Sequence, residues 1–285
     1  MENSNDNEIF LVDGSGYIFR AYFAMAKANM TNPEGTPVGA VYGFTNMIHK
    51  LLTDLNAPYL AVIFDHKTKN FRYDIYDQYK ANRDEPPEDL IPQFPMFRET
   101  CEAFGIPAID MEGYEADDLI ATYAKIAVAQ GKQVTIVGTD KDLMQLVNDD
   151  VRMYDPMKGV YITQKEVEEK FGVTPDKVVD VQALAGDSVD NIPGVPGIGV
   201  KTAAQLINEY GDLETLLERA EEIKQNKRRE SLIEFADDAR MSLKLVKLAD
   251  DVEVPFKLEE LKAHDPDTSE LIPYLQKQGF KSPLS

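Results

Sequence analysis

The first half of the chain alternates short apolar runs with segments in which apolar residues recur at helical spacing. The runs "IFLVD", "LAVIFD" and "KQVTIVGTD" predict buried strands. The segments "PVGAVYGFTNMIHKLLTDL" and "EADDLIATYAKIAVAQG" predict helices, the second ended by Gly131. The stretch "NDDVRMYDPMKGVYITQKEV" predicts two short strands around a turn at the sheet edge. This alternation predicts an α/β fold with a mainly parallel central sheet and helices on both faces.

After about residue 163 the pattern becomes helical, as in "TQKEVEEKFG" and "TPDKVVDVQALAG". We therefore expect two regions, an α/β domain over residues 1–163 and a helical region over residues 164–285. A polar, aromatic and then proline-rich excursion, residues 66–95, interrupts the first region between a strand and a helix. Long excursions of this kind often carry function.

Composition narrows the class of protein. Hydrophobic residues make up 43% of the chain, so a sizeable core can form. The N-terminus "MENSNDNEIF" does not have the form of a secretory signal, and no apolar run reaches membrane-spanning length, so we expect a cytoplasmic protein. One cysteine (Cys101) and three scattered histidines argue against a thiolate or imidazole metal site.

The formal net charge of −20 argues against non-specific nucleic-acid binding. Any nucleic-acid hypothesis must therefore identify local positive charge and explain why so many carboxylates are present.

Carboxylates follow the predicted strands at the point where each strand ends. In a doubly wound sheet these ends meet at the edge where ligands bind, and the predicted helix "EADDLIATYA" begins at the same edge. The motif "LAGDSVDNIPG" adds two more carboxylates. The nine candidates are Asp13, Asp65, Glu115, Asp117, Asp118, Asp140, Asp142, Asp187 and Asp190.

Each acidic motif has an ordinary structural explanation when it is taken alone. A single Asp after a strand is usually a turn or cap residue, and "EADD" is favourable charge at a helix N-terminus. Convergence on one edge favours Mg²⁺ or Mn²⁺ instead, since these hard cations prefer oxygen ligands. Two such ions about 4 Å apart are the usual apparatus for phosphodiester cleavage. From helical spacing we expect Glu115 and Asp118 to face the site and Asp117 to flank it.

Positive charge follows Asp65 in the excursion. If "NFRYDIYDQYKANR" is helical, a face of cations and aromatics results that can grip single-stranded nucleic acid; the alternative is a solvated amphipathic helix with its tyrosines on the core. Arg20 can also reach a phosphate. The candidate residues on that face are Arg72, Tyr76, Tyr79, Lys80 and Arg83.

The stretch "GVPGIGVKTA" predicts a helix-hairpin-helix over about residues 187–210, with backbone N–H groups and Lys201 offered to a phosphate. Its glycines are Gly194, Gly197 and Gly199. The alternative is a plain glycine-rich turn between two helices.

With these motifs the chain closely resembles the 5′ nuclease (flap endonuclease-like) family, and more narrowly the 5′→3′ exonuclease domain of bacterial DNA polymerase I. The matching motifs run in family order across roughly residues 8 to 215: "LVDGSGYIFRAYFA", "FDHKTKNFRYDIYDQYKANR", "GYEADDLIATYA", "GTDKDLMQLV" and "GDSVDNIPGVPGIGVKTA". The tail after about residue 250 matches poorly.

The resemblance implies roles for these residues. Five carboxylates would serve a first metal site, with Asp140 and Asp142 shared or adjacent: Asp13, Asp65, Glu115, Asp117 and Asp118. Asp187 and Asp190 would serve a second. Arg20, Lys80 and Arg83 would engage the scissile phosphate, and Tyr79 would stack on a nucleotide. Residues 66–95 would form a helical arch, and the hairpin would bind duplex DNA with a K⁺ ion.

The resemblance also implies a Mg²⁺-dependent, structure-specific 5′ nuclease that uses a two-metal mechanism. Its substrates would be DNA with a 5′ flap or nick and RNA primers on DNA, and its setting the bacterial nucleoid. We expect a monomer, with a DNA polymerase fused or separate. One alternative is a PIN-like RNA nuclease, whose small domain usually lacks the arch and hairpin. Another is a non-catalytic DNA-binding module, which would gain affinity by losing carboxylates.

Overall fold

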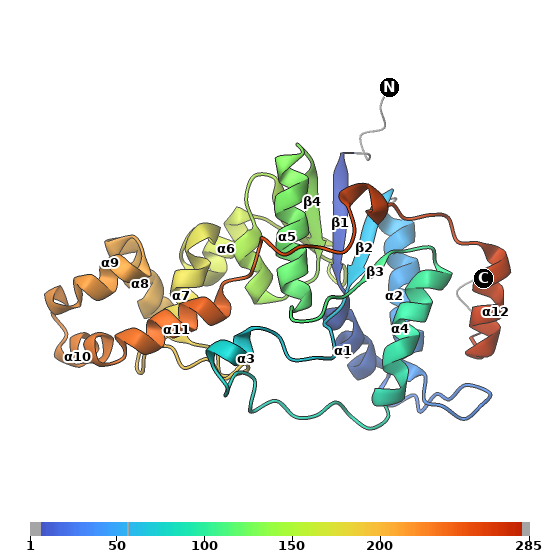
Figure 1. The fold of residues 1–285 in the computed structure, drawn as a ribbon, viewed down its shortest axis with the longest axis horizontal. Helices are drawn as coiled ribbons and strands as arrows, with labels where there is room; N and C mark the ends of the chain where they lie inside the picture. Colours follow the sequence, from blue (N-terminus) through green and yellow to red (C-terminus); the bar gives the residue numbers. More distant parts are fainter. Residues whose placement is uncertain (1–6, 56, 281–285) are drawn as a thin grey trace.

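A six-stranded sheet forms the centre of the computed structural model, which describes residues 7–55 and 57–280 (Figure 1). The strand order is β3-β2-β1-β4-β5-β6, in which β6 alone pairs antiparallel, at the edge. The strands are β1 (Glu8–Asp13), β2 (Tyr59–Ile63), β3 (Ala108–Ile109), β4 (Gln133–Val137), β5 (Val151–Asp155) and β6 (Val160–Ile162). The predicted fold class and the predicted edge strands are confirmed.

Side chains alternate across the sheet because successive strand residues point to opposite faces. In β1, Phe10 and Val12 enter one apolar cluster, whereas Ile9 and Leu11 enter the other. Both faces are therefore buried, which explains the continuously apolar strands.

Helices cover both faces of the sheet (Figure 1). The first cluster joins the sheet to α1 (Gly14–Met25), α2 (Gly39–Leu55), α4 (Phe94–Ala103) and α12 (Thr268–Lys277). On the other face lies α5 (Ala116–Ala129), which was predicted from its spacing. The helical half contains α6 (Gln164–Phe171), α7 (Val178–Ala185), α8 (Val200–Tyr210), α9 (Leu213–Glu218), α10 (Asn226–Glu234) and α11 (Ala236–Val246). Short 3₁₀ helices span Ile91–Gln93, Lys141–Leu146, Pro175–Lys177, Ala220–Glu222 and Leu258–Leu261.

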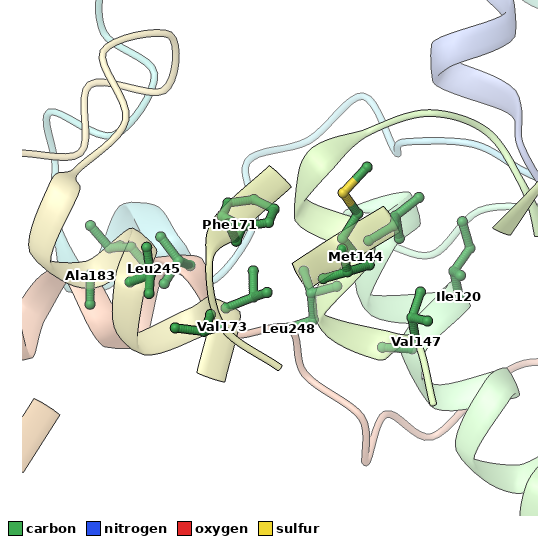
Figure 2. Packing of buried hydrophobic residues seen from close by; sticks show 14 of the residues in the cluster. Ile120, Met144, Val147, Phe171, Val173, Ala183, Leu245 and Leu248 are labelled. Atoms are coloured by element: carbon green, nitrogen blue, oxygen red, sulfur yellow. The ribbon is translucent and has the colours of Figure 1, made fainter. Parts of the chain in front are cut away.

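The apolar cluster on the α5 side continues into the helical half. Figure 2 shows this continuity, from Ile120 on α5 through Met144 and Leu248 to Phe171 and Leu245. Buried apolar contact therefore joins the two halves, and it fixes the position of the helical half relative to the strand ends.

The C-terminal part of the chain returns to the α/β half. After α11 it crosses α5, and α12 then packs beside α4 (Figure 1). There the hydroxyls of Tyr274 and Thr100 lie 2.5 Å apart. The boundary predicted at residues 163 and 164 stays a prediction, but residues 258–280 pack with the α/β half.

The excursion over residues 66–95, here called the arch segment, is not one long helix. Its helical parts are α3 (Arg72–Ile75), the 3₁₀ turn at Ile91–Gln93 and the start of α4. Lys80 has a φ of 55°, a left-handed conformation that interrupts a right-handed helix. The conditional prediction of a helical cation and aromatic face is therefore wrong.

No helix within residues 7–55 and 57–280 combines the length and apolarity needed to cross a bilayer.

Candidate metal centre and nucleic-acid interface

The acids predicted at the strand ends lie at one edge of the sheet. Asp13 is the last residue of β1 and caps α1, where its Oδ1 accepts the N–H of Gly16 at 2.9 Å. Asp65 follows β2, and its Oδ1 accepts the N–H of Ala116 at 2.8 Å. Asp65 therefore ties the end of β2 to the start of α5.

Three carboxylates form what we call the acidic centre: Asp117 on α5, and Asp140 and Asp142 after β4. Each contributes an oxygen within 4.8 Å of the others. The Asp140 side chain accepts the N–H of Asp142 at 2.9 Å. Gln182 on α7 donates its Nε2 to Asp142 Oδ1 at 2.6 Å. All of these candidate ligand atoms are oxygens, which suits Mg²⁺ or Mn²⁺.

Burial and mutual repulsion raise the pKa values of Asp13, Asp117 and Asp142. Asp13 is 5% exposed. Burial raises the pKa of Asp13 to about 7, and the negative charges of Asp140 and Asp65 contribute to the rise. The hydrogen bond from the Gly16 N–H opposes it. Burial, and then Asp140, raise the pKa of Asp142 to about 6. The pKa of Asp117 is raised well above its ordinary value for the same reasons. A bound dication would reverse this repulsion.

These shifts predict pH-dependent metal binding. Between pH 7.5 and 5.5 the half-saturating Mg²⁺ concentration should rise about 10- to 100-fold, because protons compete with the metal for Asp13 and Asp142. Titration calorimetry at both pH values measures this, and equal affinities would contradict it. In metal-free protein the raised pKa values predict that stability falls as pH rises from about 4 to about 7.

The second acidic loop, residues 187–191, carries Asp187 and Asp190, both buried. Asp187 forms an ion pair with Lys141, with 2.5 Å between Nζ and Oδ2. Asp190 accepts from Arg83 and lies 4.0 Å from Lys80 Nζ. Cations from two other segments therefore hold this loop beside the sheet edge.

Glu115 lies between the arch segment and the acidic centre. It forms ion pairs with Lys80 and, at 3.4 Å, with Arg72. Asn70 Nδ2 also donates to its Oε1 at 3.0 Å. Although burial opposes the change, the charges of Lys80 and Arg72 lower the pKa of Glu115. Glu115 is therefore held as a carboxylate beside the acidic centre.

Asp118 and Arg72, which were predicted to contact metal and DNA, form a buried ion pair with each other. Arg72 is 1% and Asp118 0% exposed. The guanidinium binds the carboxylate through two hydrogen bonds of 2.8 Å. Each oxygen of Asp118 also accepts a backbone N–H, from Ala249 at 2.9 Å or Glu115 at 3.1 Å. A carboxylate has about four acceptor positions, so none is left for a cation. This corrects the predicted metal role of Asp118 and the predicted DNA contact of Arg72, and it reverses the expected orientations of Asp117 and Asp118.

Tyr79 does not offer a stacking surface. It is 2% exposed, and its hydroxyl donates to Glu115 at 3.2 Å. Tyr73 packs edge-on against its ring. The nucleotide-stacking prediction for Tyr79 is therefore wrong. Tyr76 is partly buried against the apolar cluster on the α5 side of the sheet.

The glycine hairpin divides into a packed part and an open part. Gly194 has a φ of 60°, and a Cβ there would lie 2.4 Å from the nitrogen of Gly186. Its N–H already donates to Ser242 Oγ at 3.1 Å, so the predicted DNA role of Gly194 is corrected to close packing. Gly197 and Gly199, by contrast, have open space around them, and Lys201 is exposed in the first turn of α8.

Arg20 Nη2 donates to Thr139 Oγ1 at 3.1 Å, and Nη1 lies 3.9 Å from Asp155. Its positive charge opposes the rise in the pKa of Asp13, whose largest cause is burial.

The sequence did not point to Lys141 and Gln182, which bind acids of the site. Lys141 could have been found from its place between Asp140 and Asp142; Gln182 had no comparable signal.

The fold and the acidic edge define an α/β protein with a candidate site for a divalent cation, and comparison with known proteins identifies its family. Residues 8–172 match the family model described as "5'-3' exonuclease, N-terminal resolvase-like domain". Residues 173–269 match the one described as "5'-3' exonuclease, C-terminal SAM fold". The chain therefore belongs to the 5′-3′ exonuclease family.

Two curated relatives cover nearly the whole chain. DNA polymerase I of Rhizobium leguminosarum is 54% identical over 96% of this chain, which spans 28% of the relative. The 5'-3' exonuclease of Aquifex aeolicus (strain VF5) is 38% identical over 97% of this chain and 93% of its own. The expectation that the tail after residue 250 matches poorly is therefore wrong.

Solved structures share the fold. T5 5'-exonuclease with bound zinc ions matches with a TM-score of 0.73, at 24% identity, over 85% of this chain and 90% of that one. The catalytic core of Rad2 in complex with DNA substrate matches with a TM-score of 0.63, at 17% identity, over 96% and 89%. These similarities confirm the predicted architecture of an α/β sheet followed by a helical region.

Proposed function

We propose that this chain is a Mg²⁺-dependent, structure-specific 5′ nuclease that removes 5′ flaps and RNA primers from DNA. The carrying observation is that Lys80 and Arg83 of the arch segment pair with Glu115, whose charge acts on Asp117 of the acidic centre, and with Asp190 of the second acidic loop. Family membership supports hydrolysis of nucleic acid from a 5′ end.

Asp117, Asp140 and Asp142, with Asp13 and Asp65 beside them, would hold one cation, and Asp187 and Asp190 a second. When bound, such ions lower the pKa of water and stabilise charge on the phosphate and the leaving oxygen. The residues themselves orient the phosphate. Lys80 pairs with Glu115 and lies near Asp190, and Arg83 pairs with Asp190, so both cations can stabilise charge as it builds on the phosphate. Arg20, partly exposed near Asp13, can contact the same group.

The decisive experiment uses a labelled 5′-flap duplex with the protein in Mg²⁺ or in EDTA. We expect cleavage near the flap junction with Mg²⁺, a 5′-phosphate on the product and no cleavage with EDTA. Cleavage that is equal in EDTA, or absent with both Mg²⁺ and Mn²⁺, would disprove the proposal. An all-RNA hairpin substrate tests the PIN-like alternative, which predicts preferential cleavage of that substrate.

The open part of the hairpin supplies the duplex contact in this proposal. Lys201→Ala should weaken binding to duplexes of any sequence and lower the salt slope of log K by about 1, because it removes one phosphate contact. Lys277→Ala, which removes an exposed cation on the distant α12, is the matched control. Fluorescence anisotropy at several salt concentrations measures both variants, and an unchanged slope for Lys201→Ala would contradict the assignment.

The proposal includes the setting of the reaction. The polymerase I relatives support a nuclease that acts together with a DNA polymerase, which is either fused in the same chain or a separate protein. The nuclease would act on the bacterial chromosome in the cytoplasm. Resemblance to the family supports a monomer, and a K⁺ ion held by hairpin carbonyls.

A further inference from the structure

The base of the arch segment is joined to the second acidic loop by reciprocal hydrogen bonds. The N–H of Lys80 donates to the carbonyl of Asp190 at 2.9 Å. Asn82 Nδ2 donates to the carbonyl of Ser188 at 2.6 Å. In the other direction, Asn191 Nδ2 donates to the carbonyl of Gln78 at 2.7 Å. Each segment therefore supplies an asparagine amide that holds the backbone of the other, and we call this set of contacts the interlock.

The interlock coincides with unfavourable backbone conformations. Lys80 and Asn191 have φ values of 55° and 56°. Among the residues that the structure describes, the third non-glycine residue with positive φ is Asn29, at 44°. Such conformations cost free energy for residues with a Cβ, so they persist where surrounding contacts determine them. The left-handed turn at Lys80 directs its N–H to Asp190, while its Nζ pairs with Glu115.

We propose that Asn82 and Asn191 are positioning residues that hold Lys80 and Arg83 between the two groups of acids. Both asparagine amides donate to backbone carbonyls, so each acts through the backbone of the facing segment. Lys80 then bridges Glu115, the N-cap residue of α5, and Asp190 of the loop, and Arg83 pairs with Asp190. This inference rests on the proposed function, because Lys80 and Arg83 would be positioned to contact the substrate phosphate.

The expected effect is on the chemical step more than on substrate binding. A displacement of about 1 Å in a catalytic group can lower a rate about 10²-fold. Gly197, Gly199 and Lys201, the open part of the hairpin that we assign to duplex binding, supply none of the interlock hydrogen bonds, so we expect little change in duplex binding. The side chains exchange no proton with the substrate, so the pH profile of the remaining activity should keep its shape.

The test compares Asn82→Ala and Asn191→Gly with Asn29→Gly. Glycine at 191 keeps the left-handed turn accessible and removes only the amide. Asn29→Gly makes the same change at an exposed position in the connection after α1. For the two interlock variants we expect faster hydrogen exchange at the Lys80 amide and single-turnover flap cleavage slowed about 10- to 100-fold. The Kd for flap DNA should stay within about threefold, and Asn29→Gly should match the wild type.

The proposal would be overturned by unchanged exchange at Lys80, by faster exchange with undiminished cleavage, or by a loss confined to Kd. Thermal unfolding of each variant separates global destabilisation, which would also overturn it, from a local effect. The exchange measurement needs neither metal nor DNA. If the wild type fails to cleave any flap, the proposed function fails while the exchange result still decides whether the interlock exists.

Discussion

Asp117→Asn is expected to lower Mg²⁺-dependent single-turnover cleavage of a 5′ flap by roughly 10³-fold, because metal-ion catalysis contributes several kcal/mol. Asp117 is the member of the acidic centre that comes from α5, with oxygens of Asp140 and Asp142 within 4.8 Å. The fold should survive, since replacing a carboxyl whose pKa is raised by burial and repulsion relieves that repulsion. Quenched-flow cleavage and thermal unfolding measure the two effects.

Glu112→Gln is the matched control for that variant. Glu112 is an exposed acid three residues before Glu115 on the same approach to α5, so the change in net charge is identical. Its cleavage rate should stay within about twofold of the wild type, as expected of an exposed site. Full activity in Asp117→Asn would contradict the assignment of the acidic centre.

Asp118→Ala is expected to act on stability instead, lowering the free energy of unfolding by about 3–5 kcal/mol, because it leaves a buried guanidinium without its partner. Loss of the Asp118 carboxylate should also loosen the C-terminal end of α11 and the residues that follow it. Arg72, which Asp118 positions, donates to the carbonyls of Leu245 and Lys247 there. Urea unfolding in EDTA measures the effect without any contribution from metal.

The double variant Arg72→Met/Asp118→Leu tests the reason for that loss. Replacing a buried ion pair by apolar residues is often neutral, so the double variant should recover most of the stability lost in Asp118→Ala. If Asp118→Ala unfolds like the wild type in EDTA but loses the stabilisation given by Mg²⁺, Asp118 is a metal ligand and the structural assignment is wrong.

The chain's pattern predicted the sheet and its acidic edge because local rules determine them. Continuous apolar runs that end in Asp identify parallel strands buried on both faces, and the carboxyl ends of such strands meet. Asp13, Asp65, Asp140 and Asp142 were therefore placed from strand ends alone. The glycine hairpin was likewise found from its local turn chemistry.

Helical periodicity could not decide between Asp117 and Asp118. It shows that Glu115 and Asp118 share a face of α5, but not what that face contacts. The contact is Arg72, 46 residues away in sequence, whose charge made it a candidate for DNA instead. The prediction of a helix in the arch segment was wrong for a related reason. A tertiary hydrogen bond to the second acidic loop stabilises the left-handed conformation of Lys80. Tertiary contacts of this kind override local helical spacing.

The central claim is that the carboxylates at the strand ends form a site for divalent cations. Mn²⁺ titration followed by electron paramagnetic resonance, on wild type, Asp117→Asn, Asp140→Asn and Glu112→Gln, tests it most directly. We predict that wild type and Glu112→Gln bind Mn²⁺ alike, and that each aspartate variant binds at least about tenfold more weakly or loses an ion. Equal Mn²⁺ binding by all four proteins would contradict the account.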